Sequence, residues 1–314
     1  MSTLRAGDLE AEAGRVGKAE RLYRRALAIA ERLVRAEPSS AVSQKDLYVA
    51  CHRLGGIELA TDAVRAAERF YRRALAAAEA MVRAEPADSS CKVDLSAACG
   101  WLGDLKLKAG RLREAEEFHR RALGIDLELA EADPASASLR QGLFVSYLQL
   151  GHVTRAEKRL DQAEQLYHQA RETAEALAAA VPDVPLYRRG IGVAYSALAG
   201  AALDRGDVAE ARRLHGLALE IDEALAGAEP ANPVFQHDLF LSYARLGELA
   251  QKAGDRDEAD RLYARANAIA ESLRSADPAN PRYQQDARAL ADRVASARRA
   301  GHLAPLTGLF RRRN

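Results

Sequence analysis

The chain has 314 residues, of which 48% are hydrophobic and 5% aromatic, and its 46 basic and 45 acidic residues leave a formal net charge of +1. A nearly neutral chain lacks the long-range field that attracts nucleic acid or an anionic membrane, so we expect neither as a partner. Three cysteines exclude a disulfide framework, and no run approaches the roughly 20 apolar residues of a membrane span. We therefore expect a soluble, cytoplasmic protein.

A proline recurs every 48 residues, at Pro38, Pro86, Pro134, Pro182, Pro230 and Pro278. A fixed period of this size indicates an array of supersecondary units that cover one another's apolar faces. The period predicts a single repeat domain over residues 1–300, followed by a basic, flexible tail at 301–314. The predicted parts are a truncated first unit (1–38), five full units (39–86, 87–134, 135–182, 183–230, 231–278) and a capping helix (279–300).

Each full unit is predicted to hold two helices of roughly 20 residues. The first opens two residues after the proline on an N-cap residue, which is Ser40, Asp88, Ser136, Asn232 or Asn280; Val184 breaks this column. The turn to the second helix is marked by Gly14, Gly110, Gly206 and Gly254, with Asp62 and Lys158 in the remaining units. Most of the first helix of the first unit is absent, which indicates a frayed end or a start within a longer array.

At the other end, residues 281–300 predict an unpaired helix with Tyr283, Leu290 and Val294 on one side, which should cap the core. The tail after it ends in Arg311, Arg312 and Arg313. We expect it to be a solvated end, with a docking peptide, a fold-back onto the groove or a lipid contact as alternatives.

The pattern of large and small residues in the last full helix pair resembles a known repeat. Leu246-Gly247, Gly254, Ala259, Tyr263 and Ala266 match the order and spacing of the tetratricopeptide repeat, and the pattern recurs in the other units. The period of 48 residues exceeds the family's usual 34 or so, and is similar to kinesin light chains and to bacterial signalling arrays. The resemblance implies an all-α superhelix of antiparallel helix pairs that acts as a non-catalytic protein-interaction scaffold. The excess of arginine over lysine and the abundance of alanine indicate a bacterial source of high GC content.

In this family the first helices line the concave groove that receives a peptide or helix of a partner. The ligand-facing positions carried over to this chain are Val49, His52, Arg53, Ala97, Gly100, Trp101, Asp104, Val145, Leu148, Gln149, His152, Val193, Ser196, Leu241, Arg245 and Glu248. Trp101 and Arg245 are the predicted anchors, because aromatic and arginine residues concentrate interface energy. The alternative is that Trp101 only packs against a neighbouring unit. The wall lacks the basic residues that would hold an acidic chaperone tail.

Enzymatic chemistry is not expected, since no phosphate loop, catalytic carboxylate pair or nucleophile motif is present, and we predict no cofactor and no metal. His119 and His215 share a column with tyrosines and should be structural. Cys51 and Cys99 should be small core residues and Cys91 should lie near the surface. The partner is a protein or peptide of unknown identity, and the chain should be a monomer or a weak homo-oligomer. The alternative function is the sensor or regulatory arm of a signalling or conflict-response assembly whose enzyme lies on another chain.

Overall fold

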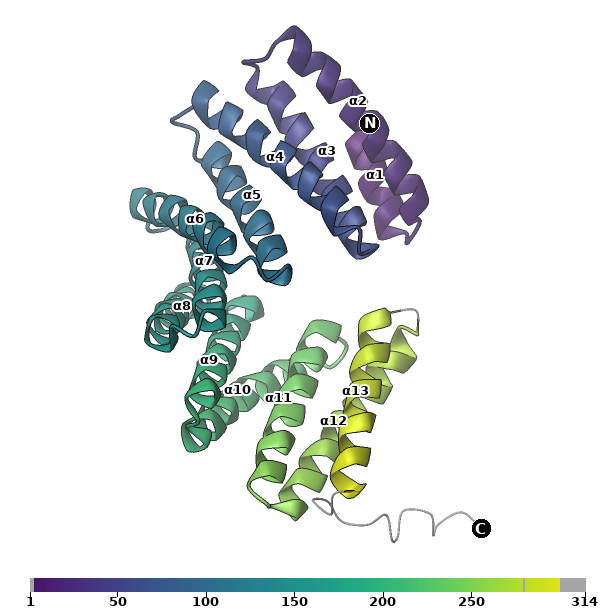
Figure 1. Ribbon diagram of the computed structural model, residues 1–314, viewed down its shortest axis with the longest axis vertical. Coiled ribbons are helices and arrows are strands. Elements are labelled where there is room, and N and C mark those ends of the chain that lie inside the picture. Colours follow the sequence, from purple (N-terminus) through teal and green to yellow (C-terminus); the bar gives the residue numbers. More distant parts are fainter. Residues whose placement is uncertain (1–2, 279, 300–314) are drawn as a thin grey trace. The chain divides into compact units, whose positions relative to one another are not determined.

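The structure is a computed structural model that describes residues 3–278 and 280–299. Within these residues it contains thirteen α-helices and no strand (Figure 1). The helices are α1 (Thr3–Glu12), α2 (Val16–Ala36), α3 (Ala41–Ala60), α4 (Val64–Ala84), α5 (Ser89–Lys108), α6 (Leu112–Ala132), α7 (Ala137–Ala156), α8 (Leu160–Ala180), α9 (Pro185–Arg205), α10 (Val208–Ala228), α11 (Pro233–Lys252), α12 (Arg256–Ala276) and α13 (Pro281–Arg299). The predicted all-α class and the alternation of first and second helices are confirmed. The tail at 301–314 lies outside the described residues.

The first helices begin where the capping residues predict. The side chain of Asp88 accepts a hydrogen bond from the backbone N–H of Ser90 at 2.8 Å, and that of Asn232 accepts one from Val234 at 3.0 Å. Ser40, Ser136 and Asn280 act in the same way. Each such bond satisfies an otherwise unpaired first-turn amide and stabilises its helix by about 1 kcal/mol. Val184 makes no side-chain cap, but Pro185 occupies the first turn of α9.

Every described turn between the two helices of a unit contains one residue in the left-handed conformation. Gly206 and Gly254 have φ of 85° and 81°, and Asp62 and Lys158 adopt φ of 58° and 63° at the equivalent positions. Glycine reaches this region without steric cost, whereas other residues do not. The turns therefore have the same backbone geometry even where the sequence lacks the glycine.

The two helices of a unit approach closely at a glycine in the first helix. A Cβ atom on Gly103 would lie 2.5 Å from His119 Nε2, and one on Gly247 would lie 2.8 Å from the ring of Tyr263. Real Cβ atoms do not come this close to a neighbour. At these glycines the ring that packs against the first helix leaves no room for a Cβ atom.

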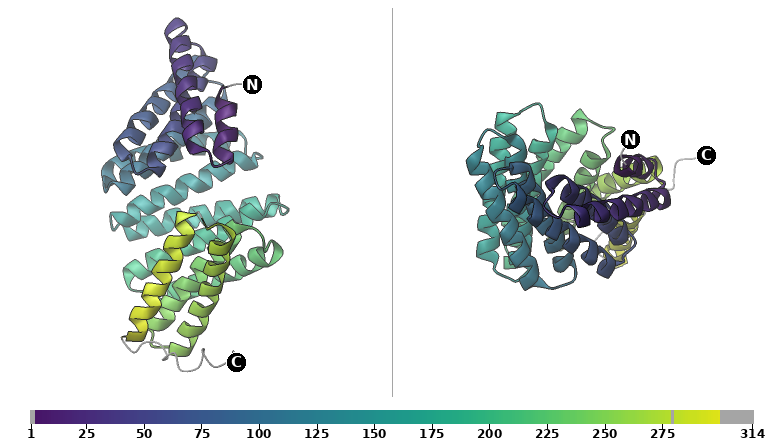
Figure 2. Two further views of the ribbon diagram at one scale, coloured as in Figure 1. Left: turned by 90° about the vertical axis from the view of Figure 1, so that its right-hand side faces the viewer. Right: turned by 90° about the horizontal axis from the view of Figure 1, so that it is seen from above.

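Close contacts divide the chain into two compact units, Met1–Leu166 and Tyr167–Asn314. The first unit has a core around Tyr23, Cys51, Leu54, Met81 and Cys99. Consecutive helices of this unit, such as α3 and α4, lie side by side (Figure 2).

The core of the second unit includes Tyr243 and Tyr263, and α13 adds Leu290 to it with Val294 packed beside it. The final helix therefore packs on the core with the apolar side that the sequence predicts. No helix among the described residues combines the length and the apolar character needed to cross a membrane.

Candidate functional site

Five of the predicted groove residues line one cavity in the first unit. The cavity has a volume of about 330 Å³ and lies between α5, α6 and α7. Its lining consists of Val93, Ser96, Ala97, Gly100, Trp101, Asp126, Ser138, Gln141, Gly142, Val145, Ser146 and Gln149. We call it the Trp101 cavity. The sequence predicted Ala97, Gly100, Trp101, Val145 and Gln149 for the partner-facing wall, and the structure brings these five together.

The side walls of the Trp101 cavity are aliphatic, and its space comes from small residues. Val93 and Val145 are 42% and 41% exposed. Ala97, Gly100 and Gly142 supply little or no side chain. A ligand that enters between the two valines therefore meets apolar surface first.

Trp101 lies between the cavity and the preceding repeat. The ring of His52 stacks on the indole with a centroid distance of 3.7 Å and an interplanar angle of 1°, and Tyr48 and Tyr71 lie 5.6 and 5.7 Å away. Burial lowers the pKa of His52 to about 4, so at neutral pH this is a contact between neutral rings. The indole packs against the neighbouring unit, as the alternative predicted, and also lines the cavity. Its role as an anchor for a partner stays a prediction.

The floor of the Trp101 cavity carries a buried carboxyl group. Asp126 is only 6% exposed, and Ser146 Oγ donates a hydrogen bond to its Oδ2 at 2.5 Å. Burial raises the pKa of Asp126, and the hydrogen bonds from Ser146 and Ser96 oppose that rise. Among the described residues, the side chains that shift its pKa are Ser146 and Ser96, and neither a lysine nor an arginine contributes.

Several of the predicted polar groove residues contact the adjacent repeat. Arg53 Nε lies 2.9 Å from Asp8 Oδ1, Gln149 Nε2 donates to Asp104 Oδ2 at 3.1 Å, and Arg293 Nη1 donates to Glu248 Oε2 at 2.8 Å. The two residues of each pair are 45 residues apart, and Arg53, Gln149 and Arg293 occupy the same position in their repeats. These side chains hold neighbouring repeats together, a role that the sequence interpretation did not assign to them.

The remaining predicted groove residues divide by exposure and by unit. In the first unit Val49 is half-buried, Leu148 is buried and His152 is exposed. In the second unit Val193, Ser196 and Leu241 are half-buried and Arg245 is exposed. Four of the second-unit residues occupy, two repeats later, the positions of cavity residues: Val193, Ser196, Leu241 and Arg245 correspond to Ala97, Gly100, Val145 and Gln149.

Comparison with known proteins supports this arrangement of helices. Residues 242–276 match the family model described as tetratricopeptide repeat. The crystal structure of BtubC (BKLC) from P. vanneervenii is similar with a TM-score of 0.61 and 22% identity, over 81% of this chain and 90% of that one. The apo form of RapI gives a TM-score of 0.56 and 12% identity, over 95% and 96% of the two chains. No curated protein sequence is significantly similar to the chain.

The chain has a tetratricopeptide-like repeat fold. The fold class and the resemblance predicted from the sequence are thereby confirmed. This fold generally serves as a scaffold for protein interaction and is typically non-catalytic.

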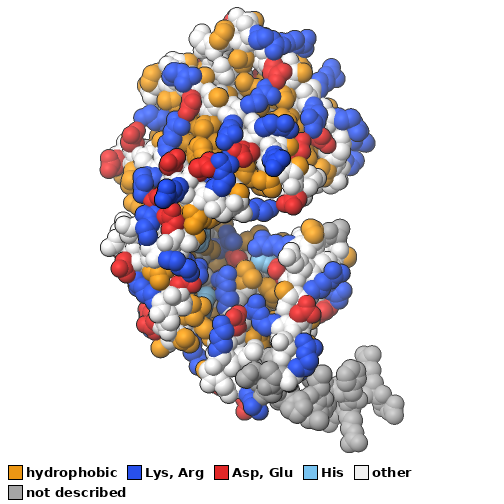
Figure 3. All heavy atoms as spheres, in the orientation of Figure 1, with side chains coloured by type: hydrophobic (Ala, Val, Ile, Leu, Met, Phe, Trp, Pro, Cys, Tyr) orange, Lys and Arg blue, Asp and Glu red, His pale blue; other side chains and the backbone are white. Residues whose placement is uncertain are grey.

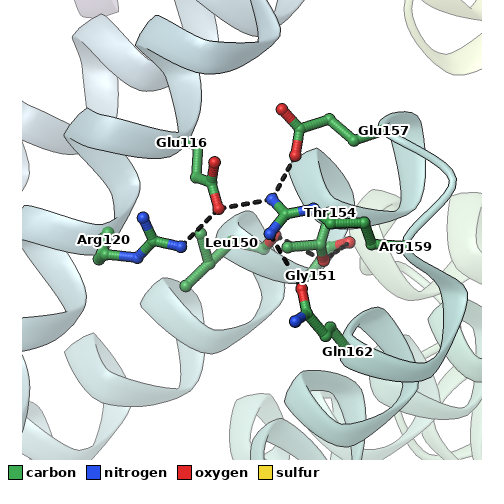
Figure 4. Close-up of polar contacts among 8 residues, drawn as sticks. All are labelled: Glu116, Arg120, Leu150, Gly151, Thr154, Glu157, Arg159 and Gln162. Carbon is green, nitrogen blue, oxygen red and sulfur yellow. Dashed lines mark hydrogen bonds and ion pairs between the residues drawn. The ribbon is translucent and has the colours of Figure 1, made fainter.

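The charged side chains on the second helices of these tetratricopeptide-like repeats pair with one another. Arg159 Nη2 donates to Glu116 at 2.5 Å and also reaches Glu157 and Gln162, while Arg120 pairs with the same Glu116 (Figure 4). The corresponding pairs Arg72 with Glu68 and Arg24 with Glu20 are present one and two repeats earlier, respectively. Over the face of the first unit seen in Figure 3, basic and acidic side chains are interspersed, as expected for a solvated face.

One group of side chains has the composition of a metal site. Ligand atoms of Glu85, Asp88 and Cys91 lie within 4.8 Å of one another. Asp88 already caps α5, and Cys91 Sγ lies 3.8 Å from Asp88 Oδ2. Cys91 was predicted near the surface, but it is 4% exposed because it faces the core side of the first turn of α5, and burial raises its pKa. The capping role accounts for this cluster.

The other cysteines and the two column histidines are core residues, as predicted. Cys51 and Cys99 are fully buried, and burial raises the pKa of each thiol to about 11, which suppresses the reactive thiolate. His119 and His215 are 0% and 3% exposed, and burial lowers the pKa of each to about 4.

The sequence interpretation missed the floor of the Trp101 cavity. It considered only first helices as walls, whereas Asp126 comes from α6. A signal was present: the column of Asp126 holds alanine at Ala30, Ala78, Ala174 and Ala270, and aspartate again at Asp222. A carboxyl group in a buried alanine column identifies a position with a special environment.

Proposed function

We propose that the chain is a non-catalytic interaction scaffold and that it binds a peptide or helix of a partner protein through the Trp101 cavity. The observation that carries this proposal is the cavity itself, open between two exposed valines and bordered by an indole. Its volume of about 330 Å³ is at the lower end for small-molecule pockets and suits one or two large side chains. Protein interfaces concentrate their binding free energy in pockets that lose their water when the partner binds.

A peptide-selection experiment tests this function. Random 12-residue peptides displayed on phage are selected on the intact chain, and the enriched peptides are measured against variants by fluorescence anisotropy. Ala97→Leu reduces the cavity volume and Val145→Asp places a charge on its apolar wall. Each should weaken binding of the enriched peptides at least tenfold, because the peptide loses the apolar contacts that anchor it.

The matched control is Val42→Asp on α3, which introduces the same charge at a valine that is 75% exposed and does not line the cavity. Peptide binding to this variant should equal that of the wild type, and circular dichroism should show that all three variants keep their helices. Enriched peptides that bind Ala97→Leu and Val145→Asp as tightly as the wild type would contradict the proposed site.

A further inference from the structure

The carboxyl group at the floor of the Trp101 cavity has one counterpart in the second unit. Asp222 on α10 lies two repeats after Asp126, is also 6% exposed, and accepts a hydrogen bond at 2.6 Å from Ser242, the counterpart of Ser146. The two sites thus have an aspartate and a serine at equivalent positions, joined by the same hydrogen bond. This repetition allows a position-by-position comparison of their surroundings.

The second unit supplies cations to its buried carboxyl group, and the first does not. Arg189 occupies the position of Val93 and Arg245 that of Gln149. The charges of both arginines act to lower the pKa of Asp222, against the larger effects of burial and of the neighbouring Asp238, which raise it to about 6. Asp238 occupies the position of Gly142 and pairs with Arg189, whose Nη2 donates to Asp238 Oδ1 at 3.3 Å.

The Trp101 cavity lies where these side chains are replaced by smaller or neutral ones. Val93, Gly142 and Gln149 replace two arginines and an aspartate. A Cβ atom added to Gly142 would lie 3.6 Å from Asp126 Oδ1, so this oxygen faces the space that the missing side chain would fill. A buried carboxylate with no cation is costly, and a cation brought to it by a ligand would recover part of that cost.

We propose that the Trp101 cavity binds an arginine side chain of the partner peptide, whose guanidinium group reaches Asp126 and supplies the positive charge that Arg189 and Arg245 bring near Asp222. This proposal rests on the proposed function and specifies the partner's chemistry. The aliphatic part of the arginine lies between Val93 and Val145, and its head reaches the carboxyl group below them. Arginine fits better than lysine, since its planar group donates several hydrogen bonds in fixed directions to carboxylate and amide oxygens.

The test uses a peptide that binds the chain, taken from the phage selection, in versions that differ at one residue. The anchor residue is arginine, citrulline, lysine or leucine, and Kd is measured by fluorescence anisotropy. Citrulline is the matched control because it keeps the length and shape of arginine without its charge. We expect the arginine version to bind at least tenfold more tightly than the citrulline version, and the selection itself to enrich arginine.

Variants of the chain distinguish a direct effect of Asp126 on the bound arginine from a general effect of the protein's charge. Asp126→Asn should abolish the preference for arginine over citrulline, whereas Asp222→Asn should leave it unchanged. The double variant Val93→Arg, Gly142→Asp copies the Arg189–Asp238 pair into the first unit. It should weaken binding of the arginine peptide at least tenfold, because the chain's own side chains then fill the cavity. Circular dichroism and thermal unfolding confirm that each variant is folded.

The outcomes distinguish this inference from the proposed function. Peptides that depend on Ala97 and Val145 but bind equally with citrulline, or whose preference for arginine survives Asp126→Asn, would overturn the arginine site and leave the scaffold function standing. Peptides that are insensitive to Ala97→Leu and Val145→Asp would overturn both. An arginine preference that is lost only in the Asp126 variant and in the double variant would support both.

Discussion

At the residue scale, the repeat predicts which side chains are equivalent, and burial then decides their chemistry. His119 occupies a column that holds Tyr71 and Tyr167, and the structure buries it completely. That role could be predicted, because a column of rings opposite a glycine has one packing function. The environment of Asp126 could not, since it depends on side chains from three helices that the sequence does not bring together.

Replacing His119 with tyrosine should reduce the acid sensitivity of the fold. Burial lowers the pKa of His119 to about 4, whereas an unfolded histidine titrates near 6.5. Between these values the unfolded chain binds more protons, so this histidine costs stability as the pH falls from about 6.5 to 4. Urea unfolding followed by circular dichroism should show that the loss of stability from pH 8 to pH 5 is ~2 kcal/mol smaller in His119→Tyr.

The reverse substitution provides the control. Tyr263→His places a histidine opposite Gly247 in the second unit, where Tyr263 is 3% exposed. It should increase the loss of stability over the same pH range. Equal pH dependence in His119→Tyr and the wild type would show that the buried imidazole does not contribute.

At the element scale, the borders of the helices follow from local chemistry and were predictable for that reason. An N-cap residue, a proline in the first turn and a left-handed residue after the last turn each act within a few residues. The contacts between repeats were harder to predict from the sequence. Gln149 meets Asp104 because of the angle between consecutive helix pairs, which no local signal encodes, so both were interpreted as ligand-facing residues.

The close approach of the helices within a pair predicts opposite effects for two Gly→Ala substitutions. In an exposed helix interior this change stabilises by about 1 kcal/mol, because alanine has the higher helix propensity. Gly216→Ala in α10 should follow this rule, since no atom lies within 4 Å of its added Cβ. Gly247→Ala in α11 should destabilise by about 1 to 3 kcal/mol instead, because its Cβ would lie 2.8 Å from Tyr263. Urea unfolding of both variants measures the change in the free energy of unfolding, which should have opposite signs. A stabilised Gly247→Ala would show that the ring moves aside at little cost.

At the scale of the whole molecule, the proposed binding site depends on departures from the repeat rather than on the repeat itself. The period accounts for helices, turns and core, and it could be extracted from the prolines alone. The Trp101 cavity arises where Val93, Gly142 and Gln149 differ from their counterparts Arg189, Asp238 and Arg245. A sequence pattern averaged over repeats removes such differences, which explains why it predicted a general wall and not this site.

The division into two compact units predicts that a local defect stays within its own unit. In arrays of this kind each repeat is stabilised by its immediate neighbours, so destabilisation decays along the chain. Gly103→Ala, whose Cβ would lie 2.5 Å from His119 Nε2, should increase amide hydrogen exchange in α4 to α7 and leave α11 and α12 unchanged. Gly247→Ala should do the reverse, raising exchange in α10 to α13 while α3 and α4 keep their protection. Mass spectrometry of peptic fragments measures both patterns in one experiment. A uniform rise of exchange along the whole chain in either variant would show that the thirteen described helices unfold as one cooperative structure, and the two units would then have no separate stability.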